Sequence, residues 1–107
     1  MIITACAVVA CHATAAYADP RENALHHIAQ AIAGAQICDR IELNEGIVAA
    51  IAYVHGVDIA RDKEEIMAQV RDHLAAMKKT SPEIGCAAAL LLYGPKGLNV
   101  PDMLREK

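Results

Sequence analysis

Histidine is the residue type in this sequence best suited to chemistry near neutral pH, because its side chain gains and loses a proton there. Five histidines occur, and four of them, His26, His27, His55 and His73, lie beyond residue 18. His26 and His27 are adjacent, so on a helix they point about 100° apart and cannot chelate a metal ion as a pair one turn apart can. We therefore expect isolated histidines, and we predict neither a metal site nor a cofactor.

The cysteines indicate one disulfide. Cys6 and Cys11 fall in the first eighteen residues, and Cys38 and Cys86 fall in the rest of the chain. Two lone cysteines of a small domain pair readily in an oxidising compartment. We predict a Cys38–Cys86 disulfide, with two buried free thiols as the alternative. A zinc site is not expected, because no Cys-x-x-Cys or spaced Cys/His set is present.

Motifs of enzymes are missing from the sequence. It has no Gly-rich phosphate loop, no Gly-x-Ser-x-Gly and no His-Glu-x-x-His. Ser81 is the one serine, and it fits a helix cap. Glu64 and Glu65 are adjacent to each other, and the two carboxylates fit the first turn of a helix. With both later cysteines paired, no thiol nucleophile remains. We predict that the chain is not an enzyme.

The first eighteen residues have the pattern of a secretory signal. An apolar run over residues 2–10 is followed by the small-x-small sequence Ala16-Tyr17-Ala18 and then by polar residues. We predict cleavage after Ala18, which leaves residues 19–107 as one domain in the periplasm. The run is too short to span a bilayer, which takes roughly 20 apolar residues.

Two other interpretations of this segment stay open. Val8-Val9-Ala10-Cys11 resembles a lipoprotein processing site, which would place a lipid on Cys11. Alternatively, the segment is the first helix of a cytosolic domain. No Lys or Arg stands near the start, as signals usually have, which would be explained by a start codon further upstream.

Charge excludes two classes of partner. Ten Lys and Arg stand against thirteen Asp and Glu, giving a formal charge of −3. The largest basic cluster is Lys78-Lys79, so neither nucleic acid nor an anionic membrane surface is expected to bind. Phe and Trp are absent, so a core must be built from aliphatic side chains. The remaining partners are proteins: a specific partner, unfolded clients or a second copy in a homodimer.

Capping signals divide residues 19–107 into helices. Asp19-Pro20, Asp62-x-x-Glu65 and Ser81-Pro82 are typical helix starts. We expect a bend or break of the first helix near Gly34, where its apolar stripe shifts. The expected helices include residues 19–41, 62–77 and 81–93. Another helix starts near Asn44 and ends at Gly56 or runs on to Arg61, and a short one begins at Val100. The predicted fold is therefore all-α: a small four-helix bundle with a short C-terminal fifth helix.

Apolar positions predict how these helices pack. The second helix is expected to turn Ile47, Val48, Ile51 and Val54 inward. Residues 84–93 are nearly all apolar, which predicts that the fourth helix is the central one. Apolar side chains of the third and fourth helices are candidates for a client-binding face, namely Ile66, Val70, Leu74, Met77, Leu91 and Leu92.

Residues 36–90 resemble the Hde-type periplasmic acid-stress chaperones. The matching positions are Cys38-Asp39 and the run Ser81-Pro82-Glu83-Ile84 that leads to Cys86. The resemblance implies a helical, disulfide-bonded periplasmic domain that holds unfolding clients in acid. Near pH 2 to 3 neutral carboxylates would leave a charge of about +14, and such self-repulsion loosens a compact state.

A second resemblance is to small periplasmic immunity proteins that neutralise secreted cell-wall amidases. It rests on residues 52–57, with Tyr53 and Gly56-Val57, and on residues 70–74 with the helix that follows. This resemblance implies tight binding of one specific partner at neutral pH. A structural or assembly factor is a third interpretation.

Overall fold

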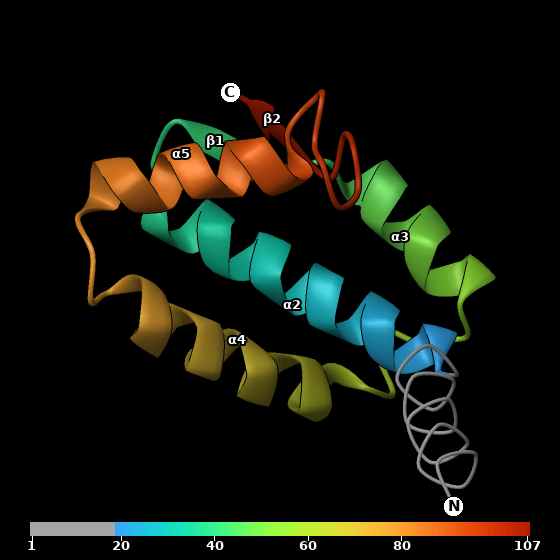
Figure 1. Cartoon of the computed structure of the whole chain (residues 1–107). Helices are drawn as coiled ribbons and strands as arrows, with labels where there is room; N and C mark the ends of the chain where they lie inside the picture. The colour runs from blue at the N-terminus through green and yellow to red at the C-terminus, as the bar shows by residue number, and fades with distance from the viewer. Residues whose placement is uncertain (1–18) are drawn as a thin grey trace, which may run out of the picture.

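Four helices and a two-stranded sheet form the part of the chain that the structure describes. The computed structural model describes residues 19–107, so the predictions on the signal segment, on cleavage after Ala18 and on Cys6 and Cys11 lie outside it. The elements are α2 (Pro20–Ile37), β1 (Ile41–Leu43), α3 (Glu45–Val54), α4 (Lys63–Met77), α5 (Pro82–Tyr93) and β2 (Leu104–Glu106) (Figure 1).

Helix α2 is the central element. It lies between α5 on one side and α4 on the other, and α3 packs near its N-terminal half (Figure 1). The prediction that the helix of residues 81–93 is central was wrong, because Ile84 and Leu91 of α5 are 59% and 58% exposed. The apolar run of α5 is divided between a face on α2 and a face in solvent.

Gly34 does not break α2. The helix is continuous from Pro20 to Ile37, so the expected break is wrong. A Cβ on Gly34 would lie 2.8 Å from the Cβ of Ala89, which is closer than side-chain carbons approach. The glycine therefore lets α2 and α5 pack closely, and the shift of the apolar stripe reflects a helix that is covered on several sides.

Two of the predicted helix starts are confirmed in detail. The side chain of Asp19 accepts a hydrogen bond from the backbone N–H of Glu22 at 3.0 Å, and Pro20 occupies the first turn. Ser81 accepts from the N–H of Ile84 at 3.3 Å in the same way. Asp62 precedes α4 as predicted, but its side chain does not cap that helix.

The predicted C-terminal fifth helix is wrong. Residues Leu104–Glu106 form β2, which pairs antiparallel with β1 so that Leu43 lies opposite Leu104 and Ile41 opposite Glu106. Asp102, with φ 67°, makes the turn that leads into β2. Met103 and Leu104 are buried. The expected helix would have buried the same two side chains. Strands of three residues are too short to show a period of two in the sequence.

The predicted disulfide is confirmed. Cys38 follows the last residue of α2, Cys86 lies in the first turns of α5, and the two are bonded with Cα atoms 5.2 Å apart. The bond fixes the end of the central helix to the start of α5. Among helices of residues 19–107, none combines the length and apolar character that crossing a bilayer requires.

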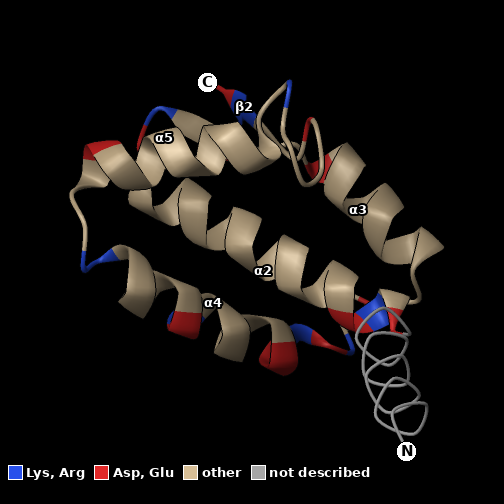
Figure 2. Ribbon diagram, viewed as in Figure 1, with Lys and Arg blue, Asp and Glu red and all other residues tan. Residues whose placement is uncertain are grey.

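Charges are spread unevenly over the helices. Figure 2 shows α3 and α5 almost free of coloured residues, whereas α4 carries both signs along its exposed side. In α3 the one ionisable Asp, Glu, Lys or Arg is Glu45, at the first position. Its outer face is therefore not the charged face that a solvent-exposed helix usually has.

Candidate functional site

Tyr93 is a fully buried side chain at the end of α5 with a hydroxyl that has three polar neighbours. The hydroxyl donates a hydrogen bond to Gln30 Oε1 in α2 and accepts one from Asn99 Nδ2 at 3.5 Å. His27 Nδ1 lies 2.8 Å from the same oxygen. A phenol has a single proton, which goes to Gln30, so His27 donates to Tyr93 through Nδ1–H.

Three histidines gather beside this tyrosine. The ring of His26 lies 4.8 Å from the ring of His73 and 5.5 Å from that of His27, measured between centroids. We call His26, His27, His73 and Tyr93 the histidine cluster. It joins α2, α4 and α5. The prediction of isolated histidines was wrong for these three, because only the fold brings His73 to α2.

Burial favours the uncharged forms of His27, His73 and Tyr93. The pKa of His27 and that of His73 are lowered, first because burial penalises the charged form and second because a charge on His26 repels theirs. Asp72 acts in the opposite direction on His73. Burial also raises the pKa of Tyr93, so its phenol keeps its proton. Acid would therefore place like charges at the junction of α2 and α4.

No metal-binding arrangement accompanies the cluster. Within residues 19–107, no group of three or more His, Cys, Asp or Glu side chains is placed to hold a metal ion. The absence of a cofactor stays a prediction.

The candidate client-binding residues do not form one open face. Ile66 and Val70 are buried against α2, and Leu74, Met77 and Leu92 are half-buried. Leu91 projects into solvent from α5. The apolar stripe of α4 is thus largely covered by α2 in the closed domain.

An apolar groove opens between α2, α3 and α4. Its volume is about 620 Å³, and Ile28 and Ile32 of α2 form part of its lining. Glu45 and Lys63 are the two charged residues that line it. The other lining residues are apolar, namely Leu43, Val48, Ala49, Ile59, Ala60, Ile66 and Met67. A volume and lining of this kind suit the burial of apolar groups from another molecule.

Helix α3 presents an exposed apolar side next to this groove. Tyr53 is 88% exposed and Val54 is 71% exposed, and Ala49 and Ala50 are exposed one turn before them. We call these four residues and Ile59 the α3 surface. The prediction that Val54 points inward was wrong, because α3 turns Val48 and Ala52 toward the core instead.

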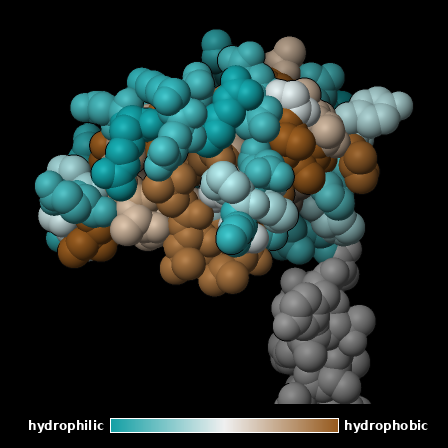
Figure 3. All heavy atoms as spheres, turned by 90° about the horizontal axis from the view of Figure 1, so that it is seen from above, coloured by the Kyte–Doolittle hydropathy of each residue, from teal (hydrophilic) through white to brown (hydrophobic). Residues whose placement is uncertain are grey.

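A second groove extends the α3 surface. It has a volume of about 530 Å³, is lined by Tyr53, Val57 and Arg61 among others, and shares Ala49, Ile59 and Ala60 with the first groove. Gly56, with φ 75°, ends α3 and lets the chain turn beside it. Seen from above, hydrophobic residues reach the surface near the middle of the face and again at the right, where α3 lies (Figure 3).

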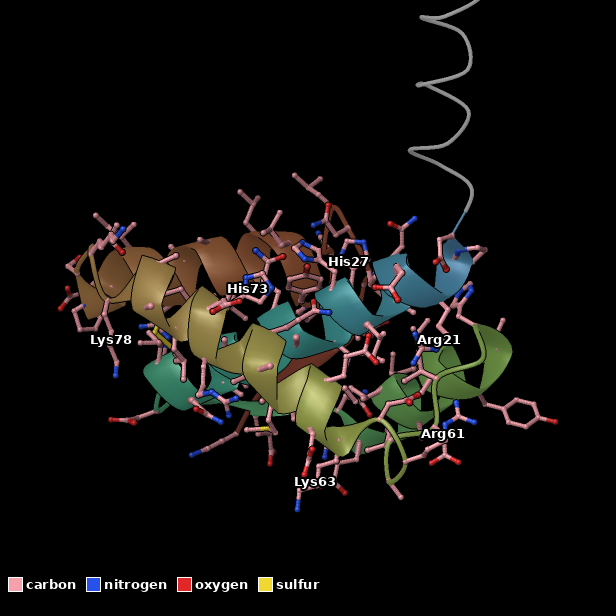
Figure 4. The ribbon with its side chains drawn as sticks, turned by 90° about the horizontal axis from the view of Figure 1, so that it is seen from below. Arg21, His27, Arg61, Lys63, His73 and Lys78 are labelled. Carbon is pink, nitrogen blue, oxygen red and sulfur yellow. A yellow bond between two sulfur atoms is a disulfide. The ribbon has the colours of Figure 1, made fainter. Side chains whose placement is uncertain are left out.

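An ion-pair network lies at the start of α4. Asp62 is within 3.1 Å of Arg21 of α2 and 3.2 Å of Arg61, and Arg21 also pairs with Glu65 at 3.1 Å. Hydrogen bonds from Arg61 and from the backbone N–H of Asp58 lower the pKa of Asp62 to about 2. Figure 4 shows Arg21 and Arg61 at one end of α4 and Lys78 at the other. The network ties the first turn of α2 to the first turn of α4.

Comparison of the chain with protein-family models, curated proteins and solved structures found no match. Neither the resemblance to the Hde-type chaperones nor that to the immunity proteins gains or loses support from it. We therefore argue the function from the chemistry of the surface.

Proposed function

We propose that residues 19–107 are an exported domain that binds one specific protein partner at neutral pH, as an inhibitor or immunity protein does. The observation that carries the proposal is the exposure of Tyr53 and Val54 on the α3 surface, in a closed domain, beside one apolar groove and a second groove of mixed polarity. No rearrangement is needed to make this surface accessible.

The chemistry of the α3 surface fits a protein interface. Tyrosine supplies a large, stiff contact area with a polar tip, and it is enriched among residues that dominate binding energy. A contiguous apolar patch on a small domain marks an interaction site more often than it marks chance exposure. The buried centre of an interface is depleted in charge, and the uncharged side of α3 has this character.

The charges around the α3 surface have both signs. Asp58 and Arg61 border the second groove, and Glu45 and Lys63 border the first. Mixed charges at a rim favour one complementary partner and give no general attraction to polyanions. The partner that fits is a protein with an apolar protruding segment for the first groove and a recess for Tyr53. The predicted signal segment and the Cys38–Cys86 disulfide support an extracytoplasmic encounter.

The test uses the oxidised protein and a matched pair of variants. A partner is recovered from periplasmic extract at pH 7.5, purified, and titrated calorimetrically against wild type, Tyr53→Ala and Leu98→Ala. Leu98 is 72% exposed and lies in the loop after α5, and it is not one of the residues of the α3 surface. We expect a 1:1 complex that Tyr53→Ala weakens at least about tenfold, as loss of a central interface tyrosine does, and that Leu98→Ala leaves unchanged. Equal effects of both variants on the affinity would reject the α3 surface as the binding site.

An acid-activated holdase chaperone is a second candidate, supported by a different observation. The apolar stripe of α4, including Ile66, Val70 and Leu74, is covered by α2 at neutral pH, and the histidine cluster lies at that junction. Charging the cluster and neutralising the carboxylates would uncover the stripe for unfolding clients. Oxidised and reduced protein would be tested for suppression of aggregation of an acid-sensitive client at pH 2.5 and 7. If the protein does not suppress aggregation of the client at pH 2.5, the chaperone function is rejected.

A further inference from the structure

The contact between α4 and α2 is held at two places of different chemistry. Near the middle of α4, His73 packs against His26, and His27 beside them bonds to Tyr93 of α5. At the start of α4, Asp62 pairs with Arg21. Between these places, the buried side chains of Ile66 and Val70 pack on α2.

The two places differ in how they respond to acid. A neutral imidazole packs against another imidazole at little cost, but two imidazolium rings 4.8 Å apart repel each other. Because burial disfavours the charged form of His73, closure of α4 loses stability as the pH falls below about 6.5. The Asp62 pair persists in that range, because the carboxylate has a pKa of about 2 and stays ionised.

Few charged groups oppose this response. Asp72 on α4 partly offsets a charge on His73. On α2, Glu22 lies one turn before His26, and it is paired with Arg21 at 3.0 Å. Helix α5 and the loop after it contribute Tyr93 and Asn99 to the cluster, and both are uncharged. The net result of protonation is repulsion between α2 and α4.

We propose that α4 is an acid-releasable flap. The neutral histidine cluster fastens it to α2, and the Arg21–Asp62 ion pair is its hinge. Protonation of the cluster releases the middle and C-terminal part of α4 while the hinge keeps its first turn in place. Residues 78–81 join α4 to α5 and can extend to roughly 13 Å, which leaves room for the release. The Cys38–Cys86 bond keeps α5 on α2 meanwhile.

Release of the flap changes the surface on both sides of α4. In the view from below, His27 and His73 lie on the side of α4 toward α5, and Lys63 projects from the opposite side (Figure 4). That opposite side forms one wall of the first groove through Ile66 and Met67. On the proposed function, the partner would therefore bind more weakly at pH 5 than at pH 7.5. The flap itself does not depend on a partner.

The flap is tested by hydrogen exchange on the free, oxidised protein at pH 7.5 and 5.0, corrected for intrinsic exchange rates. Wild type is compared with His73→Gln, which cannot acquire a charge, and with His55→Gln, an exposed histidine after α3 that serves as the control. We expect protection of residues 70–77 to fall at least about tenfold at pH 5.0 in wild type and in His55→Gln, and to fall much less in His73→Gln. Protection of α5 should hardly change.

Two results would overturn the flap: protection of residues 70–77 that is unchanged at pH 5.0, or an equal loss in His73→Gln and wild type. If His73→Gln does not fold, NMR titration of wild type decides instead. The amide shifts of α4 should then follow the titration of His73, and shifts that move only in the carboxylate range would contradict the proposal. No partner is present in this experiment, so a negative result for the flap does not bear on partner binding. In the same way, a failure to find a partner does not bear on the flap.

Discussion

At the scale of single residues, the hydroxyl of Tyr93 ties the end of α5 to α2 and to the loop that follows α5. It is the common hydrogen-bonding partner of His27, Gln30 and Asn99, and the Tyr93 side chain is fully buried. A buried polar group that loses its partner costs more free energy than the bond itself contributes, because it is not resolvated. The conservative change Tyr93→Phe therefore tests the network with little change in packing.

We expect Tyr93→Phe to lower the free energy of unfolding by about 1–3 kcal/mol, measured by urea denaturation at pH 7.5. Tyr53→Phe is the matched control. The hydroxyl of Tyr53 is on an exposed side chain, so its loss should change stability by less than about 0.5 kcal/mol. Equal effects of the two changes would show that the network around Tyr93 adds nothing to stability.

Local signals are predictable from sequence, and the cluster is not. The caps Asp19 and Ser81 act within three residues, so their patterns are readable in the chain. The pairing of Cys38 with Cys86 follows from there being two cysteines in the domain. The contact of His26 with His73 depends on how α4 crosses α2, and no spacing in the sequence records that crossing.

At the scale of elements, the close approach of α2 and α5 depends on Gly34. An added Cβ would meet the Cβ of Ala89 at 2.8 Å, and that atom is fixed to the backbone and cannot move aside. Alanine gains about 1 kcal/mol of helix propensity over glycine, whereas overpacking a core costs about 1–3 kcal/mol. A glycine within a helical pattern indicates either a bend or a close contact, and the sequence does not decide between them.

We expect Gly34→Ala to destabilise the domain by up to about 2 kcal/mol in thermal or urea unfolding, because the clash outweighs the gain in propensity. Gly46→Ala in α3 serves for comparison. The nearest atom to its Cβ would be Asn44 Oδ1 at 3.7 Å, so this change should stabilise by about 0.5–1 kcal/mol. A stabilising Gly34→Ala would mean that α2 and α5 are further apart than described here.

The hinge of α4 gives a second prediction at this scale. The pKa of Asp62 is lowered to about 2, so its stabilising effect is present above the ordinary value near 3.8 and disappears as the pH falls toward 2. We expect Asp62→Asn to lower the melting temperature at pH 5 and to flatten its dependence on pH between 4 and 2. Glu64→Gln, in the same turn but outside the network, should leave both unchanged. A wild-type slope that persists in Asp62→Asn would contradict the assignment.

The start of α4 was predicted from the sequence and the two-stranded sheet was not, and the two cases differ in physical terms. Asp62-x-x-Glu65 correctly located the start of α4, but Asp62 bonds to Asp58, Arg61 and Arg21 instead of capping the helix. The strands β1 and β2 were not predicted, because each is three residues long and the two lie far apart in the sequence. Pairing between distant segments leaves little trace in either of them.

At the scale of the whole molecule, one covalent bond holds a core with few large side chains. Phe and Trp are absent from the sequence, and alanines make up much of the buried face of α2. With 48 residues separating its cysteines, the disulfide reduces the entropy of the unfolded chain by an amount worth about 4 kcal/mol. This is comparable with the entire stability of a small domain.

We therefore expect the Cys38→Ser/Cys86→Ser double variant to lose about 4 kcal/mol and to be largely unfolded near 37 °C, followed by circular dichroism. Wild type treated with reductant should behave in the same way. A cooperative transition at the wild-type temperature in either sample would show that the aliphatic core suffices by itself. The sequence predicted this bond, but it did not predict that α2 is the central helix. Apolar content alone does not distinguish a central helix from a helix with an exposed apolar side.

The central claim is that the α3 surface contacts a specific protein partner at neutral pH. The most direct measurement places a photo-crosslinking amino acid at Tyr53 in the full chain, and for comparison at Leu98, in cells that make the protein. We predict one discrete adduct from position 53, absent from position 98, whose added mass is that of a single protein other than this chain. No adduct at position 53, the same adducts from both positions, or an adduct of twice the chain's own mass would contradict the claim.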